Sequence, residues 1–194
     1  MKIDSIKNYI SEESLFKKLA DEIYALTIHL NGTYPGYKEW FYEKQINGCL
    51  TPNRNIIFIK NEKDEIIALS CLKKDDEEKK ICTLFVSDEY RKQGLGSILF
   101  EESIKFLETT KPLVTFTEDK LLMFEKMIIK YDWELTEIVD GIYQDGTREF
   151  CFNGQLSKRN YRQELIDILK KIRDKAKLEI DDNDKIDKIS IKNK

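Results

Sequence analysis

Residues 81–107 read ICTLFVSDEYRKQGLGSILFEESIKFL, and this stretch decides the fold. Its first six residues predict a buried strand, RKQGLG at 91–96 predicts a tight loop, and the residues from Ser97 onward predict a helix with apolar residues at helical spacing. The unpaired N–H groups at a helix N-terminus attract anions, and glycine lets a phosphate approach them closely. The stretch therefore predicts an anion-binding cradle between a strand and a helix.

The composition is that of an ordinary soluble domain. Of 194 residues, 41% are hydrophobic and 36% are charged, which supplies enough apolar material for one core. The formal charge of −3 predicts no general attraction to nucleic acid or to anionic membranes. The four cysteines form no CxxC pair, so we expect reduced, buried thiols and no metal site.

Neither a secretory leader nor a membrane span is indicated. The residues after Met1 lack a charged segment followed by an apolar run, and no stretch approaches the roughly 20 apolar residues that cross a bilayer. We therefore expect a cytoplasmic protein with no membrane partner.

Alternating and periodic segments predict the order of the elements. Strands are expected near residues 1–10, 56–59, 66–72, 81–86, 113–117, 134–143 and 148–152, and helices near 12–30, 37–46, 97–107 and 121–131. Asn47-Gly48 is expected to end the second helix. Four apolar residues are expected to form the core face of the last of these helices: Leu122, Phe124, Met127 and Ile128.

The glycine pattern alone is a weak signal, but its context excludes two common phosphate loops. No Gly-Lys-Ser/Thr follows, so the loop is not of the Walker type. Leu99 occupies the place of the third glycine of a dinucleotide fingerprint. A meander of strands also precedes the loop, whereas both of those folds begin with it.

Together with the strands before it, the stretch resembles the GNAT superfamily of N-acetyltransferases, over about residues 1–154. The resemblance implies an α/β fold with a mixed, mostly antiparallel central sheet flanked by helices, and it implies acetyl-CoA as co-substrate. By the same resemblance, the pantetheine arm pairs with Leu84, Phe85 and Val86. The pyrophosphate would bind the loop, whose residues are Arg91, Lys92, Gln93, Gly94, Leu95, Gly96 and Ser97. The implied activity is direct acetyl transfer to a primary amine of a small molecule or peptide.

The acid and the base of that reaction are harder to assign. Members of the family often carry a tyrosine on the helix after the fifth strand, where it protonates the departing thiolate, but Ile128 stands at that place here. Tyr131 is the nearest tyrosine. Candidate bases are Glu118 after the fifth strand and His29 at the end of the first helix, while the neighbouring Asp119 also fits a helix cap.

Two other functions stay open at this point. The missing acid is compatible with a CoA-binding regulatory or interaction module that has lost its chemistry. An acetyltransferase that acts on charged tRNA is a further alternative. The net negative charge of residues 1–154 argues against it, and we expect no nucleic-acid partner.

Two segments lie outside the cradle. Tyr34-Pro35-Gly36-Tyr37 with Trp40 could wall the acceptor site or form a rigid turn on the core. Residues 155–194 hold twelve basic and eight acidic residues and predict a charged helical extension with a disordered end. That extension could pack on its own domain, join a second copy in a homodimer, or meet an acidic surface.

Overall fold

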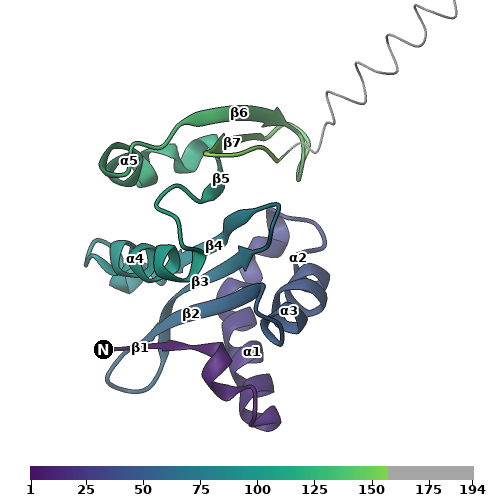
Figure 1. Ribbon diagram of the computed structural model, residues 1–194, viewed down its shortest axis with the longest axis vertical. Helices are drawn as coiled ribbons and strands as arrows, with labels where there is room; N and C mark the ends of the chain where they lie inside the picture. Colours follow the sequence, from purple (N-terminus) through teal and green to yellow (C-terminus); the bar gives the residue numbers. More distant parts are fainter. Residues whose placement is uncertain (157–194) are drawn as a thin grey trace, which may run out of the picture. The chain divides into compact units, whose positions relative to one another are not determined.

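A single seven-stranded sheet carries the fold, in the order β1-β2-β3-β4-β5-β7-β6 (Figure 1). Within residues 1–156, only β4 and β5 pair in parallel, and the other neighbouring strands are antiparallel. The strands are β1 (Lys2–Ser5), β2 (Arg54–Lys60), β3 (Ile66–Lys74), β4 (Lys79–Val86), β5 (Leu113–Thr117), β6 (Leu135–Asp140) and β7 (Arg148–Phe152). This computed structural model describes residues 1–156, and it confirms the mixed, mostly antiparallel sheet. The expected helix within 155–194 lies outside the described residues.

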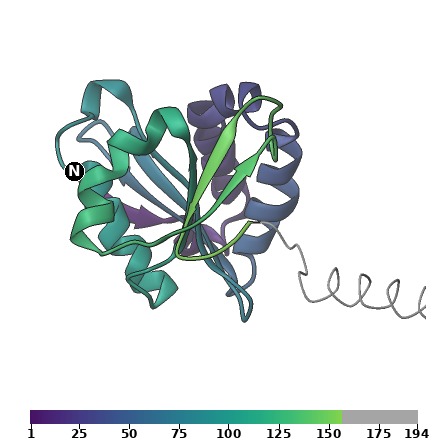
Figure 2. The same cartoon turned by 90° about the horizontal axis from the view of Figure 1, so that it is seen from above.

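Helices cover both faces of the sheet. Figure 2 shows α4 and α5 on one side and α1 with the segment after it on the other. The α-helices are α1 (Glu13–Thr27), α2 (Tyr37–Glu39), α3 (Asn47–Cys49), α4 (Leu95–Leu107) and α5 (Leu121–Lys130). Between α2 and α3 the chain forms a π-helix, η3 (Trp40–Ile46), and the short 3₁₀ turns are η1 (Ile6–Tyr9), η2 (Ile28–Gly32), η4 (Asp88–Tyr90) and η5 (Glu118–Lys120). Within residues 1–156, no helix combines the length and the apolar character needed to cross a membrane.

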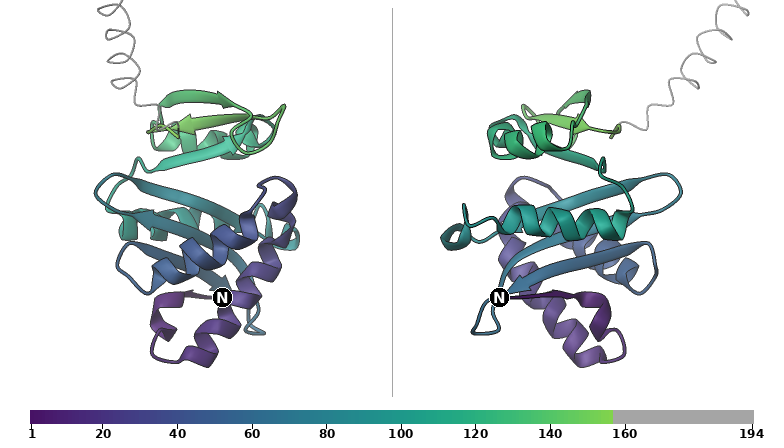
Figure 3. Two further views of the ribbon diagram at one scale, coloured as in Figure 1. Left: turned by 90° about the vertical axis from the view of Figure 1, so that its right-hand side faces the viewer. Right: turned by 60° about the vertical axis from the view of Figure 1, so that its left-hand side comes forward.

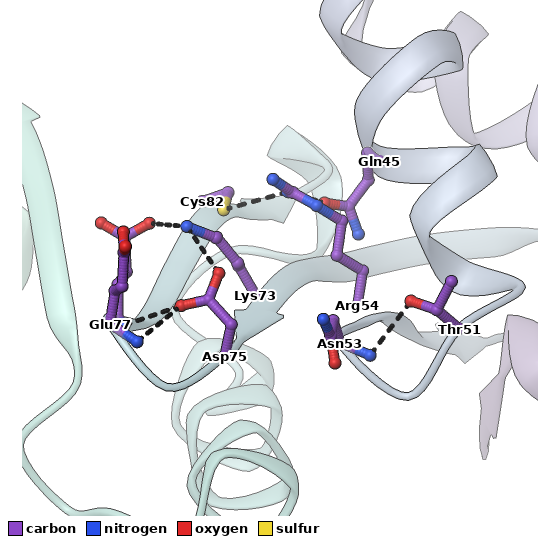
Figure 4. A network of polar contacts seen from close by, with 9 residues as sticks. Gln45, Thr51, Asn53, Arg54, Lys73, Asp75, Glu77 and Cys82 are labelled. Carbon is purple, nitrogen blue, oxygen red and sulfur yellow. Dashed lines mark hydrogen bonds and ion pairs between the residues drawn. The ribbon is translucent and has the colours of Figure 1, made fainter.

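The expectation that Asn47-Gly48 ends the second helix is wrong, because the helical turns continue to Cys49. Gly48 serves close packing instead, since a Cβ there would lie 2.4 Å from Cδ of Arg54. The Nη1 of Arg54 donates to Oε1 of the buried Gln45 at 3.0 Å (Figure 4). Gln45 Nε2 in turn donates to the carbonyl of Asn55 at 2.8 Å, which ties the helical segment to β2.

Each face of the sheet has its own core. On the α1 face, Ile23 and Phe41 pack on inward residues of β2 and β3, and on the α4 face Leu99 and Phe100 do the same from α4. Burial of this apolar surface is the main force that holds the helices on the sheet.

The predicted core face of α5 is correct for three residues and wrong for Leu122. Phe124, Met127 and Ile128 pack on the core, but the Leu122 side chain is 82% exposed and Leu121 takes the inward position. The reason is that α5 begins directly after the η5 turn, which sets the inward face at Leu121 and Phe124. The rings of Phe124 and Phe116 stack with their centroids 4.4 Å apart.

Candidate active site

The strands β4 and β5 separate soon after they meet. They pair only at Lys80–Leu113 and Ile81–Val114. The register between β3 and β4 shifts at the same level, because Leu72 pairs with Ile81 while Cys71 pairs with Thr83. A bulge of this kind bends a strand and ends its pairing. Figure 3 shows the result as two halves of the sheet, β1–β4 and β5–β7, that part along β4 and β5.

A narrow cavity lies where the two strands part. Its lining is largely apolar and comes from residues 81–84 of β4, residues 114–116 of β5, Phe100, Phe124 and Trp133. The indole Nε1 of Trp133 is buried and has no hydrogen-bond acceptor among residues 1–156. An unpaired buried donor costs about 1–3 kcal/mol, and the residue that carries this one belongs to the cavity lining.

The segment predicted to pair with a pantetheine arm lies along this opening. Leu84 and Val86 pack on the α4 core, whereas Phe85 points to the α1 face, where its ring centroid lies 5.5 Å from that of His29. Because β5 no longer pairs here, the backbone groups on the β5 side of residues 83–86 have no strand partner in the described sheet. A linear amide chain could add to this edge by β-type hydrogen bonds.

The glycine loop delivers the chain into α4 without a side-chain cap. Gly94 is the N-cap with φ of +82°, and its carbonyl accepts from the N–H of Ser97 at 3.0 Å and of Ile98 at 3.1 Å. The preceding Lys92 also has a positive φ, of 62°. The first turn of α4 therefore presents its N-terminal amides and the positive end of its dipole next to the β4 edge.

Gly96 is not required by the packing of the protein itself. It lies inside α4, and a Cβ at this position would meet only Met127 Cε, 3.9 Å away. Glycine in a helix is less favourable than alanine by about 0.5–1 kcal/mol, so the space above this backbone is kept open at a cost in stability. A cradle that a Cβ would partly fill fits an anionic ligand.

Arg91 and Gln93 fasten the loop to its surroundings. Arg91 Nε donates to the carbonyl of Val86 at 3.2 Å, and its Nη2 lies 2.7 Å from Oδ1 of Asp88. Gln93 Nε2 donates to the carbonyl of Glu89 at 3.1 Å. The guanidinium thus lies at the end of β4, beside η4.

The structure does not bring the three predicted acid–base residues together. His29 is exposed on η2, on the α1 face, and Glu118 forms an ion pair with Arg148. Tyr131 packs on the opposite face, where its ring centroid lies 4.6 Å from that of Phe100. None of the three is buried.

Glu149 on β7 is the buried carboxylate that the sequence interpretation missed. It is 1% exposed, and within residues 1–156 neither carboxylate oxygen accepts a hydrogen bond of full geometry, although the Tyr34 hydroxyl is close enough to act on its pKa. It lies opposite Thr117 of β5. The signal in the sequence was an acidic residue in the strand REFCF, where alternation places Glu149 on the same face as the apolar Cys151 and opposite to its charged neighbour Arg148.

The surroundings of Glu149 favour its neutral form. Its pKa is raised to about 7, mainly by burial and also by the charge of Asp119, while Lys80 and the Tyr34 hydroxyl partly oppose the rise. Burial likewise raises the pKa of Tyr143 to about 12, and the charge of Glu149 adds to it. Titratable groups with pKa values displaced toward neutrality gather at functional sites.

Other chemistry finds less support in the described part of the chain. Burial raises the pKa of the Cys71 and Cys82 thiols, so both are protonated near neutral pH. Within residues 1–156, no three His, Cys, Asp or Glu side chains lie close enough together to hold a metal ion.

Known proteins were compared with the chain by sequence and by structure. A model of the Acetyltransferase (GNAT) family matches residues 20–117. No curated protein sequence gave a significant match.

Solved structures of acetyltransferases resemble the chain at low sequence identity. A GNAT-family acetyltransferase from Bacillus cereus ATCC 10987 has a TM-score of 0.55 and 17% identity, over 78% of this chain and 96% of that one. The ribosomal-protein-S18-alanine N-acetyltransferase from Escherichia coli has a TM-score of 0.50 and 13% identity, and the match covers 72% of this chain and 92% of that one. Nourseothricin acetyltransferase has a TM-score of 0.47 and 12% identity. This match covers 52% of this chain and 64% of the length of nourseothricin acetyltransferase.

Proposed function

The chain belongs to the GNAT family of acetyltransferases, and on that premise we propose that it transfers an acetyl group from acetyl-CoA to a primary amine. The observation that carries this proposal is the uncapped first turn of α4 beside the parted strands β4 and β5. One end of this arrangement suits phosphates, and the other suits a neutral, amide-containing arm.

The donor would be held by three groups of residues. The amides of residues 94–97, with Arg91 and Lys92, would bind the pyrophosphate, which agrees with the spare room above Gly96. The free edge of Leu84, Phe85 and Val86 would align the pantetheine arm. Acetyl-CoA supplies an acetyl group already activated as a thioester.

Direct attack by the amine is favoured over a covalent acetyl-enzyme. A cysteine nucleophile needs thiolate character, and burial raises the pKa of both Cys71 and Cys82. Direct transfer requires instead that the amine be held next to the thioester and lose its proton.

The two tyrosines of the aromatic turn around residues 34–37 have different surroundings. Tyr37 is 5% exposed and packs in the α1-face core, as the rigid-turn alternative predicts. Tyr34 instead reaches the β6–β7 loop, where it meets Tyr143 near Glu149. Of the two tyrosines, Tyr34 therefore suits the wall of an acceptor site.

A CoA-binding module without chemistry is the second candidate, because Ile128 occupies the place of the family's tyrosine acid and packs in the core. Both candidates require CoA binding, and only the enzyme requires turnover.

Two measurements test these functions. Calorimetric titration with CoA and thermal unfolding with acetyl-CoA should both show binding, and the absence of stabilisation at millimolar ligand would remove both candidates. Release of free CoA thiol should then be followed with polyamines, amino acids, aminoglycosides and lysine peptides. Acceleration by an amine supports the enzyme, whereas tight binding without acceleration by any amine supports the module.

A further inference from the structure

The Glu149 carboxylate lies buried on the α1 face of the sheet, one strand away from the β4–β5 opening, and it forms no ion pair within residues 1–156. Burial of a charged group without partners is costly, and a natural sequence keeps such a group at a functional site more often than in a passive core. Its exposed fraction is 1%, and its register partner Thr117 ends β5. It therefore lies near the C-terminal end of β5, toward which β4 and β5 diverge.

Two tyrosines from separate loops lie beside this carboxylate. The rings of Tyr34 and Tyr143 meet edge to face, with centroids 5.1 Å apart and planes at 82°. Both phenols interact with Glu149, whose charge raises the pKa of each. Aromatic faces attract cations, and together with a buried carboxylate they form a site for an ammonium group.

We propose that Glu149 receives the ammonium group of the acceptor between Tyr34 and Tyr143 and removes its proton. This inference rests on the proposed acetyl transfer and adds the general base and the charge of the acceptor. The acceptor is therefore a primary ammonium compound whose charged nitrogen enters an aromatic pocket.

The ammonium gives one proton to the Glu149 carboxylate, and the neutral amine attacks the acetyl carbonyl carbon. The C–N bond forms, the C–S bond breaks, and the nitrogen's second proton ends on the departing sulfur. Glu149 then releases its proton to solvent, so each cycle yields an amide, a free thiol and one proton. Burial assists the first step, because it disfavours both the ammonium and the carboxylate as ions.

All the ionisable groups that act on Glu149 come from neighbouring elements. They are Lys80 on β4, Asp119 on η5, Tyr34 before α2, Tyr143 in the β6–β7 loop and Cys151 on β7. Of these only Lys80 is cationic, and no ion pair joins it to Glu149 among the described residues. An incoming ammonium would thus be the first close positive partner of this carboxylate.

The binding half can be tested without acetyl-CoA. Carboxyl ¹³C NMR of the full chain should show one glutamate with a pKa near 7 whose signal is missing in Glu149→Gln. We expect n-butylammonium chloride to lower this pKa by about half a unit or more, because a nearby cation favours the carboxylate. n-Butanol, which has the same carbon chain but no charge, should leave it unchanged. No shift, or equal shifts with both compounds, overturns the proposal.

The catalytic half uses the amine that gives the fastest thiol release. Glu149→Gln should lose about 10²–10⁴-fold in kcat/KM, together with its rise between pH 6 and 8, while its affinity for CoA stays unchanged. Glu134 is an exposed glutamate before β6, and Glu134→Gln is the matched control. This variant should keep the wild-type kcat/KM and its rise between pH 6 and 8. A Glu149→Gln enzyme within fivefold of wild type overturns the role of the base.

The two proposals fail in different ways. If no amine accelerates thiol release but n-butylammonium still shifts the pKa of Glu149, the acetyl transfer is overturned and the ammonium site stands. If transfer proceeds in Glu149→Gln and no shift occurs, the transfer stands and the ammonium site is overturned.

Discussion

The rings of Tyr34 and Tyr143 meet edge to face with 5.1 Å between their centroids. One residue precedes α2 and the other lies in the β6–β7 loop, so this contact joins the two halves of the sheet on the α1 face. Edge-to-face packing is the arrangement that the quadrupoles of two aromatic rings prefer. Both phenols interact with the buried Glu149 carboxylate, and the properties of Glu149 should therefore depend on this pair.

Removal of the Tyr143 ring should let water reach Glu149. We expect Tyr143→Ala to lower the pKa of Glu149 from about 7 toward the ordinary value of 4.5, because burial is the largest cause of its rise. Tyr143→Phe keeps the ring and should leave the pKa nearly unchanged. Carboxyl ¹³C NMR titration of both variants checks this, and equal pKa values in the two would contradict it.

Stability should fall as pH rises through the titration of Glu149. The pKa is about 7 in the folded protein and 4.5 is the ordinary value, so between these pH values the folded state holds a proton that the unfolded chain has released. The stabilisation is complete below about pH 4.5 and is lost as pH rises through 7.

A neutral side chain removes this dependence. As the pH rises from 5 to 8, the free energy of unfolding of Glu149→Gln should therefore increase relative to that of wild type by up to about 3 kcal/mol. Urea unfolding at several pH values measures the difference. Parallel stability curves for the two proteins would show that Glu149 is not a buried, titrating group.

Gly96→Ala should separate stability from ligand binding. A Cβ has room at this position, so alanine should stabilise the free protein by about 0.5–1 kcal/mol. The same methyl group would stand over the first-turn amides and should weaken CoA binding at least about tenfold, roughly 1.4 kcal/mol. Gly32→Ala is the control, because its Cβ would meet nothing within 4 Å and the residue lies far from α4 in the chain. Unchanged CoA affinity in Gly96→Ala would mean that the phosphates bind elsewhere.

The cradle could be predicted because its signals are local. A strand, two glycines and a helix follow one another within a single stretch, and each leaves its own pattern in the sequence. Glu149 left no such pattern. Its burial depends on pairing with β5 and on two tyrosines from distant loops, which are tertiary facts. The prediction for Leu122 was wrong for another reason. Leu121 and Leu122 fit an apolar helical face equally well, and the η5 turn determines which of them points inward.

Asp88 should compete with CoA for Arg91. The guanidinium lies 2.7 Å from the Asp88 carboxylate, and a phosphate would have to share or displace this contact. Asp88→Asn should tighten CoA binding by about threefold at low salt, with less effect at high salt, because exposed ion pairs are weak and screened. Asp76→Asn, in the β3–β4 turn, is the control for net charge. Equal tightening in both variants would point to long-range charge and not to Arg91.

Trp133 should report on the pantetheine arm alone. Its indole Nε1 is buried without an acceptor among residues 1–156, and the residue lines the cavity between β4 and β5. Trp133→Phe removes this donor and keeps a ring in the core, so the free protein should change in stability much less than the roughly 3–5 kcal/mol typical of Trp→Ala.

The ligand comparison then locates the effect. CoA should bind Trp133→Phe more weakly, by about tenfold, because a hydrogen bond from a buried donor would be lost. The nucleotide half of CoA, 3′-phospho-ADP, has no pantetheine and should bind both proteins equally. Calorimetric titration with the two ligands makes the comparison, and Gly96→Ala should weaken both of them. If Trp133→Phe weakens both ligands alike, the indole acts through the α4 core, where its ring lies 5.3 Å from that of Phe100, and not through the cavity.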